Sequence, residues 1–166
     1  SRTGNLNTSR SGHTATLLAN GQVLVAGGVT ADYILLDNAE LYDPATGMWN
    51  ATDSLRIARS LHLATQLPRG KVLVTGGYIY AEPYFLSSAE IYDPLTGRWS
   101  GADNLNGAWL STGTLLPNGE VLITEWDSAE LYDPAAGIWS NAGTLNTARE
   151  AYTATLLPNG QVLITG

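Results

Sequence analysis

The side chains with the clearest chemical use are arginines that recur in loops between strand-like segments. Arg10, Arg59 and Arg149 each stand just before such a segment, and Trp109 stands near the corresponding position in the remaining copy. A guanidinium group donates in a planar fork that suits carboxylates and phosphates. Two interpretations stay open: the arginines bind a ligand, or they bond loop carbonyls and acids of neighbouring repeats.

Aromatic residues gather in one stretch, GYIYAEPYFLS at 77–87. It places Tyr78, Tyr80, Tyr84 and Phe85 on one loop, and Trp126 joins Trp109 at the same predicted end of the fold. Flat amphipathic rings give a large contact area at low entropy cost, which suits stacking on sugars or gripping an extended peptide. The alternative is a loop that folds its own aromatics down as a lid on the core.

Catalytic and metal chemistry has little support in the residue types. The chain has no cysteine, and His13 and His62 are its only histidines. A zinc site made by this chain alone is therefore disfavoured, and neither histidine has a recognisable catalytic partner. We expect no cofactor and no metal.

One hexapeptide occurs three times, as AELYDP at 39–44, AEIYDP at 89–94 and AELYDP at 129–134. A Gly and a Trp follow each copy at fixed distance, the tryptophans being Trp49, Trp99 and Trp139. Asp-Pro-x-x-Gly favours a turn, because Pro presets φ, Asp accepts from nearby amides and Gly supplies positive φ. The repeat is thus a structural unit, and we expect the tryptophans between units.

Each unit contains four short segments that alternate apolar and polar residues and are rich in Val, Thr, Tyr and Trp, which indicates strands. We take the valine-rich run as the first, inner strand, the hexapeptide as the second, the Trp segment as the third and a Thr/Leu-rich segment as the fourth. The inner strands are 23–28, 72–77, 121–126 and 162–166, and the fourth strands are 13–18, 62–67, 111–116 and 152–157. Asn-Gly and similar turns join each fourth strand to the next inner strand, so neighbouring strands are antiparallel.

A four-stranded antiparallel unit of this length cannot bury two apolar faces alone, and it must stack on copies of itself. The predicted fold class is therefore an all-β propeller of four-stranded blades, with repeat units at about 22–67, 71–116 and 120–157 and flanking strands at 11–18 and 161–166. Because three units are too few to close a ring, we expect the segment to be part of a larger propeller or to self-associate.

The two ends of such a blade differ. The loops after the inner strand and between the third and fourth strands open on one end, and the Asp-Pro and Asn-Gly turns lie at the other. The turns are uniform among copies, whereas the loops vary. Loops that vary on a repeated scaffold are where binding usually occurs.

These motifs resemble Kelch repeats: Gly-Gly closes the inner strand, Tyr-Asp-Pro lies in the second, Gly-x-Trp opens the third, and Arg-Ser-x-His precedes the fourth. The resemblance covers essentially the whole chain. It implies a β-propeller of five to eight blades. The third copy departs from the pattern, with Glu125-Trp126 in place of Gly-Gly and a shorter loop after it.

The resemblance also implies functions. In Kelch adaptors of ubiquitin ligases, the matching arginines and the residue after Gly-Gly line the ligand pocket; here that residue is Tyr78, and Val29 in the first copy. We therefore expect a non-catalytic module that binds a protein or carbohydrate ligand through Arg10, Arg59, Arg149, Tyr78, Tyr80, Tyr84, Trp109 and Trp126. The alternatives are part of a Kelch-propeller enzyme, of the galactose oxidase or sugar epimerase kind, with its catalytic residues outside this segment, and a purely architectural spacer.

Composition narrows the partners. The formal net charge is −7 and the eight basic residues form no block, which disfavours nucleic acid. No apolar run reaches eighteen residues, so we expect no membrane partner. The compartment stays open, with a lean towards an extracellular or secreted protein.

Overall fold

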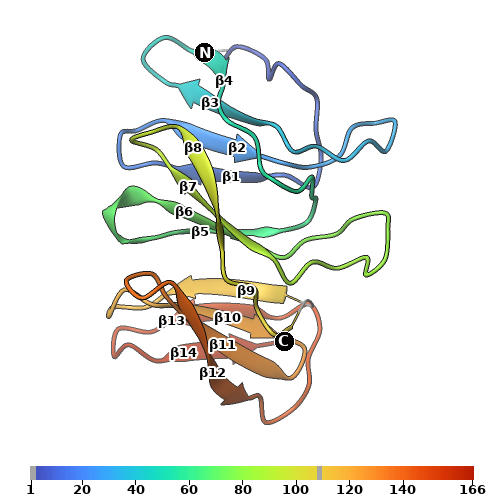
Figure 1. Cartoon of the computed structure of the whole chain (residues 1–166). Helices are drawn as coiled ribbons and strands as arrows, with labels where there is room; N and C mark the ends of the chain where they lie inside the picture. The colour runs from blue at the N-terminus through green and yellow to red at the C-terminus, as the bar shows by residue number, and fades with distance from the viewer. Residues whose placement is uncertain (1–2, 108–109) are drawn as a thin grey trace.

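The computed structural model describes residues 3–107 and 110–166, and they form an arc of antiparallel β-sheets (Figure 1). The first sheet contains β1 (Thr14–Leu17), β2 (Val23–Ala26), β3 (Ala39–Asp43) and β4 (Met48–Ala51). The strands follow one another in chain order across the sheet, and all pairs are antiparallel. The sheet is therefore a simple up-and-down meander.

The next two sheets repeat this meander. The second contains β5 (Leu63–Gln66), β6 (Val72–Thr75), β7 (Ala89–Asp93) and β8 (Arg98–Ala102), with a short 3-10 turn η1 (Pro68–Gly70) between β5 and β6. The third contains β9 (Leu110–Leu115), β10 (Val121–Glu125), β11 (Ser128–Asp133) and β12 (Ile138–Thr144). A two-stranded sheet of β13 (Thr153–Leu156) and β14 (Val162–Thr165) follows. The all-β fold class with four-stranded antiparallel blades is confirmed.

The strands follow one another as predicted, but each sheet begins one strand earlier than the predicted repeat unit. The segment at 23–28 is the second strand rather than the innermost, and the segment taken as a fourth strand is the first strand of the following sheet. The reason is that the tight turn at 18–22 keeps β1 and β2 hydrogen-bonded, whereas the longer connection at 52–62 carries the chain from β4 to a new sheet. The sheets therefore span 14–51, 63–102 and 110–144.

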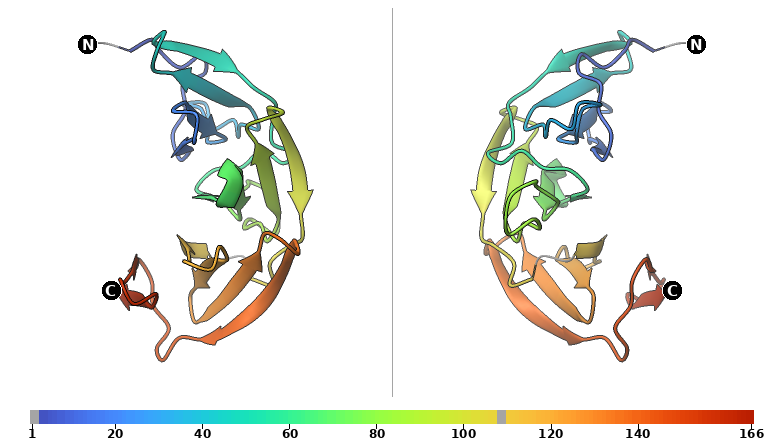
Figure 2. Two further views of the ribbon diagram at one scale, coloured as in Figure 1. Left: turned by 90° about the vertical axis from the view of Figure 1, so that its left-hand side faces the viewer. Right: turned by 90° about the vertical axis from the view of Figure 1, so that its right-hand side faces the viewer.

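The sheets fan around a common axis, with their first strands on the concave side and β4, β8 and β12 on the convex side (Figure 2). Successive first strands contact one another, β1 with β5, β5 with β9 and β9 with β13. This is the arrangement of blades in a propeller, seen here as an open arc.

The core lies between successive sheets. One cluster joins Leu24 and Ala39 of the first sheet to Val72 and Val74 of the second, and another joins Leu73 of the second sheet to residues of the third such as Val121 and Ile123. The central strand β6 is buried along its whole length. Burying both faces of a sheet in this way requires a neighbour on each side, as the sequence predicted.

The recurring tryptophans fasten each sheet to the segment that enters it. Trp99 lies 5.1 Å from Tyr92, ring centre to ring centre, and its indole N–H donates to the Asp53 carbonyl at 2.9 Å. Trp49 and Trp139 make the same type of bond, to the carbonyls of Gly4 and Asp103. The predicted position of these rings between blades is confirmed for Trp99, which is 9% exposed.

The predicted turns are also present. In the first copy the Asp43 carboxylate accepts from the Ala45 amide at 2.8 Å, the Gly47 amide donates to the Asp43 carbonyl at 2.8 Å, and Gly47 has φ of +71°. These turns lie at one end of the arc and the longer loops at the other (Figure 1). No helix in the described ranges is long and apolar enough to cross a membrane.

Candidate functional site

The loop end is built from hairpin extensions of the second and third strands. The β2–β3 loop is held by isolated bridges from Val29 to Ser11 and to Leu35, and the β6–β7 loop by bridges from Tyr78 to Ser60 and to Phe85. Each loop therefore leaves the sheet as a paired ribbon. Its tip projects beyond the strands on the side opposite the turns (Figure 1).

Tyr78 organises the aromatic residues of the second loop. Its ring meets Tyr80 edge-on at 5.4 Å and Phe85 at 5.7 Å between ring centres. Tyr80 and Tyr84 are 49% and 44% exposed. The loop is thus both a small aromatic cluster and an exposed surface, so neither the ligand-binding nor the lid interpretation describes all of it.

Tyr84 and Tyr33 occupy the same unusual position in consecutive loops. Both have left-handed backbone, with φ of +63° and +61°, and both amides close a tight turn, onto the carbonyls of Ala81 and Thr30. Tyr33 is 75% exposed. The sequence analysis missed Tyr33, although a tyrosine in each of two equivalent loops was a readable signal.

Arg59 is enclosed by the root of the β6–β7 loop. Its Nη1 donates to the carbonyls of Gly76 at 2.7 Å and Ser88 at 3.0 Å, and its Nη2 donates to Glu90 Oε1 at 2.8 Å and Ser88 Oγ at 3.0 Å. The guanidinium is fully buried. Arg59 therefore joins the two strands from which the loop emerges.

Arg10 repeats this arrangement in the first sheet. Its Nη1 donates to the carbonyls of Gly27 at 2.8 Å and Asn38 at 3.1 Å, and its Nη2 lies 2.7 Å from Glu40 Oε1. Arg149 makes the equivalent bond to the Gly166 carbonyl at 2.7 Å, again seventeen residues along the chain. The structure thus places Arg10 and Arg59 at loop roots, where they show the bonding to loop carbonyls and an acid that was one of the two alternatives, and it places Arg149 beside the residue that follows β14.

The two predicted tryptophans of the loop end are Trp126 and Trp109. Trp126 is 41% exposed and follows β10 directly. Trp109 lies outside the described residues. The aromatic loop-end residues therefore come from three different sheets, with Tyr33 on the first, the predicted tyrosines on the second and Trp126 on the third.

His62 is a buried side chain that bonds the preceding sheet. His62 is 4% exposed, and its Nε2 is 2.8 Å from Thr14 Oγ1 of the preceding sheet. Burial, together with Arg59 and then His13, lowers the pKa of His62 to about 3. A neutral imidazole that links two sheets fits a packing role.

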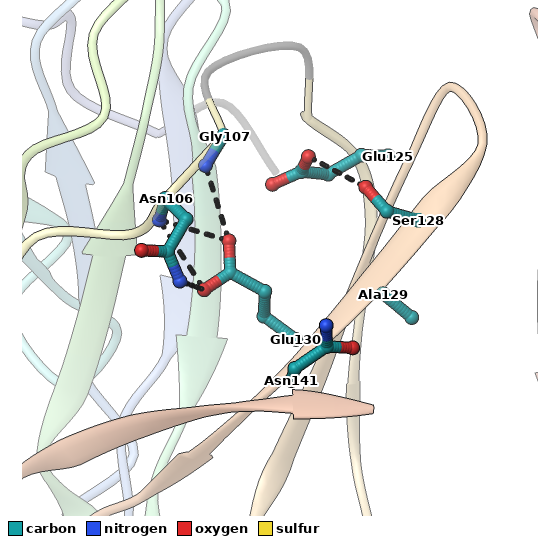
Figure 3. A pocket seen from close by; sticks show the side chains of 7 residues that line it. All are labelled: Asn106, Gly107, Glu125, Ser128, Ala129, Glu130 and Asn141. Atoms are coloured by element: carbon teal, nitrogen blue, oxygen red, sulfur yellow. Dashed lines mark hydrogen bonds between the residues drawn. The ribbon is translucent and has the colours of Figure 1, made fainter. Parts of the chain in front are cut away.

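The third sheet has a pocket where the other two have an arginine (Figure 3). Asn106, Gly107, Glu125, Ser128, Ala129, Glu130 and Asn141 line it, and its volume is about 280 Å³. Glu130 accepts from the amides of Asn106 and Gly107, while Glu125 accepts from Ser128 Oγ at 3.0 Å. Two carboxylates thus face one small space.

Burial raises the pKa of Glu125 and the hydrogen bond from the Ser128 hydroxyl lowers it, while the charge and close approach of the Glu130 carboxylate, and then the charge of Asp127, raise it further. The sequence analysis noted Glu125 only as a departure from the repeat. Its proximity to Glu130 needed the strand register, which sets Glu130 opposite Ile123, two residues before Glu125 on the same strand. Within the described ranges, no group of three or more His, Cys, Asp or Glu side chains could hold a metal ion.

The fold and its loop end define a class, the propeller-type repeat chains built of four-stranded antiparallel blades. Residues 64–106 match the family model of the Kelch motif, a range that covers most of the second sheet and the chain that leaves it. The chain therefore carries a Kelch motif, and its three four-stranded sheets fit a Kelch-repeat propeller. No curated protein sequence matches the chain.

Proposed function

We propose that the chain is a non-catalytic binding module that takes a protein or carbohydrate ligand on its loop end, with the exposed tyrosines of the β6–β7 loop as the main contacts. The Kelch motif supports a binding module in general. The observation that carries the proposal is the placement of Tyr33 and Tyr84, two exposed rings at left-handed positions of consecutive loops.

Backbone strain makes this placement informative. A non-glycine residue in the left-handed region costs roughly 1–2 kcal/mol, and glycine removes the cost. Tyr84 accepts that cost while its ring stays 44% exposed, so the folded chain gains little burial in return. Strained residues of this kind concentrate at ligand-binding positions.

The neighbouring rings make the surface ready to bind. Tyr80 is held edge-on by Tyr78, which packs in turn on Phe85. An aromatic ring that is already oriented loses little conformational entropy on contact. Arg59 contributes indirectly, because it fixes the carbonyls of Gly76 and Ser88 at the loop root.

The test is a peptide and glycan array probed with the chain and with two variants, Tyr80→Ala and Tyr84→Gly. Both residues are about half exposed, so we expect the free energy of unfolding to change by about 1 kcal/mol or less. For Tyr84→Gly, relief of the backbone strain offsets part of the stability that is lost with the side-chain contacts. The array signals that the chain gives should be lost in both variants.

Leu95→Ala provides the matched control, because Leu95 is 91% exposed on the β7–β8 turn at the opposite end. It should keep every array signal. An array without any ligand, or signals that survive both tyrosine substitutions, would contradict the proposal.

A further inference from the structure

The first two sheets share one guanidinium-binding frame. In each, a glutamate of the third strand accepts from two consecutive backbone amides, Asn7 and Thr8 for Glu40, and Arg56 and Ile57 for Glu90. The same glutamate then pairs with a buried arginine. The arginine's other nitrogen bonds the two carbonyls at the loop root, one of which belongs to a glycine.

The third sheet keeps the glutamate and its two backbone donors but not the arginine. Glu130 is 4% exposed and accepts from the Asn106 amide at 2.9 Å and the Gly107 amide at 3.1 Å, as its two counterparts do. The sequence has no arginine at the corresponding place, and Trp109 stands near it. Among the described residues, no basic side chain forms an ion pair with Glu130 or Glu125.

Two further sequence differences from the other copies add a second carboxylate to the pocket. Glu125 stands where Gly27, Gly76 and Gly166 stand in the other copies, and Gly107 stands where Thr8 and Ile57 stand. A Cβ on Gly107 would collide with the Glu125 carboxylate, so the glycine leaves room for it. Glu125 is 7% exposed, and its Oε1 has no hydrogen-bond partner in the part of the chain that the structure describes.

We propose that this pocket of the third sheet binds the guanidinium group of an arginine side chain presented by a partner protein. Glu130 occupies the place of Glu40 and Glu90, and Glu125 and Ser128 occupy the places of the residues whose carbonyls bond the second guanidinium nitrogen. The partner's arginine thus provides the guanidinium that Arg10 and Arg59 provide in the first two sheets.

The geometry favours a guanidinium over an ammonium. The acceptors lie on two sides of the pocket, with Glu130 beside Asn106 and Gly107 and with Glu125 beside Ser128 (Figure 3). A planar fork with five donors can reach both sides at once, whereas an ammonium is a point charge with three donors. At about 280 Å³ the pocket lies just below the usual range for small-molecule sites and suits a single side chain.

Electrostatics agree with a cationic occupant. Burial, Glu130 and Asp127 all raise the pKa of Glu125, because two nearby carboxylates share one water-poor space. A bound guanidinium offsets that repulsion for both acids. Asn106 Nδ2 donates to Glu130 Oε2 at 2.8 Å, but a neutral amide supplies no compensating charge.

The test is calorimetric titration of the chain with N-acetyl-arginine methylamide, with the isosteric neutral citrulline compound and with the lysine compound. We expect saturable binding of the arginine probe at one site, with citrulline and lysine at least tenfold weaker. Glu125→Gln keeps the shape of the side chain and removes its charge, and it should weaken arginine binding at least tenfold.

Glu120→Gln is the matched control. It makes the same change of charge on the β9–β10 turn, where two of the other copies already have Gln22 and Gln161, and it should alter binding less than twofold. Tyr80→Ala should also leave the arginine probe unaffected, which separates this site from the tyrosine surface proposed above. Far-ultraviolet circular dichroism and the unfolding midpoint would show that each variant is folded.

Equal binding of the lysine probe would overturn the guanidinium assignment. Absence of saturable arginine binding, an undiminished affinity in Glu125→Gln, or displacement of the probe by millimolar Ca²⁺ that itself saturates the site would overturn the proposal.

Discussion

Removing the Arg59 guanidinium tests whether the recurring arginines hold the blades together. Arg59→Met keeps the apolar stem, but it takes away the donors to the carbonyls of Ile57, Gly76 and Ser88 and the partner of the Glu90 carboxylate. Both members of the ion pair are buried, with side-chain exposures of 0% and 3%.

The magnitude follows from what is left behind. Breaking a buried ion pair by removing one partner costs about 3–5 kcal/mol, because the other charge stays buried. Glu90 still accepts from the amides of Arg56 and Ile57, which places the cost near the lower end of that range. For a chain of this size, about 3 kcal/mol corresponds to a fall of roughly 6–12 °C in Tm.

Urea unfolding followed by tryptophan fluorescence measures the change. Arg98→Met is the control, because Arg98 is an exposed arginine of the same sheet, and it should change the free energy of unfolding by less than about 0.5 kcal/mol. The double variant Arg59→Met/Glu90→Gln should recover part of the loss, since the unpaired charge is gone. If Arg59→Met cost less than about 1 kcal/mol, the arginine would not be holding the loop root.

Two further perturbations test the packing between sheets. Trp99→Ala should lower the free energy of unfolding by about 3–5 kcal/mol in a thermal melt, because it removes a buried ring and the bond to Asp53; a fall of only a degree or two in Tm would contradict this. His62 stays neutral in the folded chain, with a pKa of about 3, while the unfolded chain protonates it below about 6.5. The free energy of unfolding therefore falls as the pH falls through this window. Between pH 7 and pH 4.5, urea titrations of the unmodified chain should show a loss about 2–3 kcal/mol larger than those of His62→Gln. Equal losses in the two proteins would refute the assignment.

The strands were predictable because each copy presents the same local signals. Alternating Val and Leu, Asp-Pro-x-x-Gly and Gly-x-Trp act over a few residues, and the structure contains every element that they predict. The phase of the repeat was not predictable in the same way. The Asn-Gly turns predicted the hairpin that β1 and β2 form, but a repeated sequence reads equally well from any of its four strands, and the strand order of each whole sheet shows where it begins.

The role of the arginines could be narrowed from the sequence only to two alternatives. Arg59 and Glu90 are thirty-one residues apart, and their pairing depends on the register of β6 with β7. The exposure of Tyr80 and Tyr84 likewise depends on how the loop folds, because Tyr78 and Phe85 in the same stretch are only half-buried partners of the cluster. Side-chain function in a repeat therefore needs the long-range contacts that a local pattern does not contain.

The third sheet differs from the other two in how its buried glutamate is compensated. Where arginine closes the loop root, the Glu40 and Glu90 carboxylates are paired with a cation within the chain. Where arginine is absent, Glu130 keeps the same two backbone donors but no charge partner among the described residues, and Glu125 adds a second carboxylate at its side. Burying two acids without a cation is costly for folding alone. The raised pKa of Glu125 lets a proton relieve part of that cost, and the proposed arginine ligand would relieve it by pairing with both carboxylates. We therefore expect a ligand to increase the stability of the one blade that departs from its neighbours.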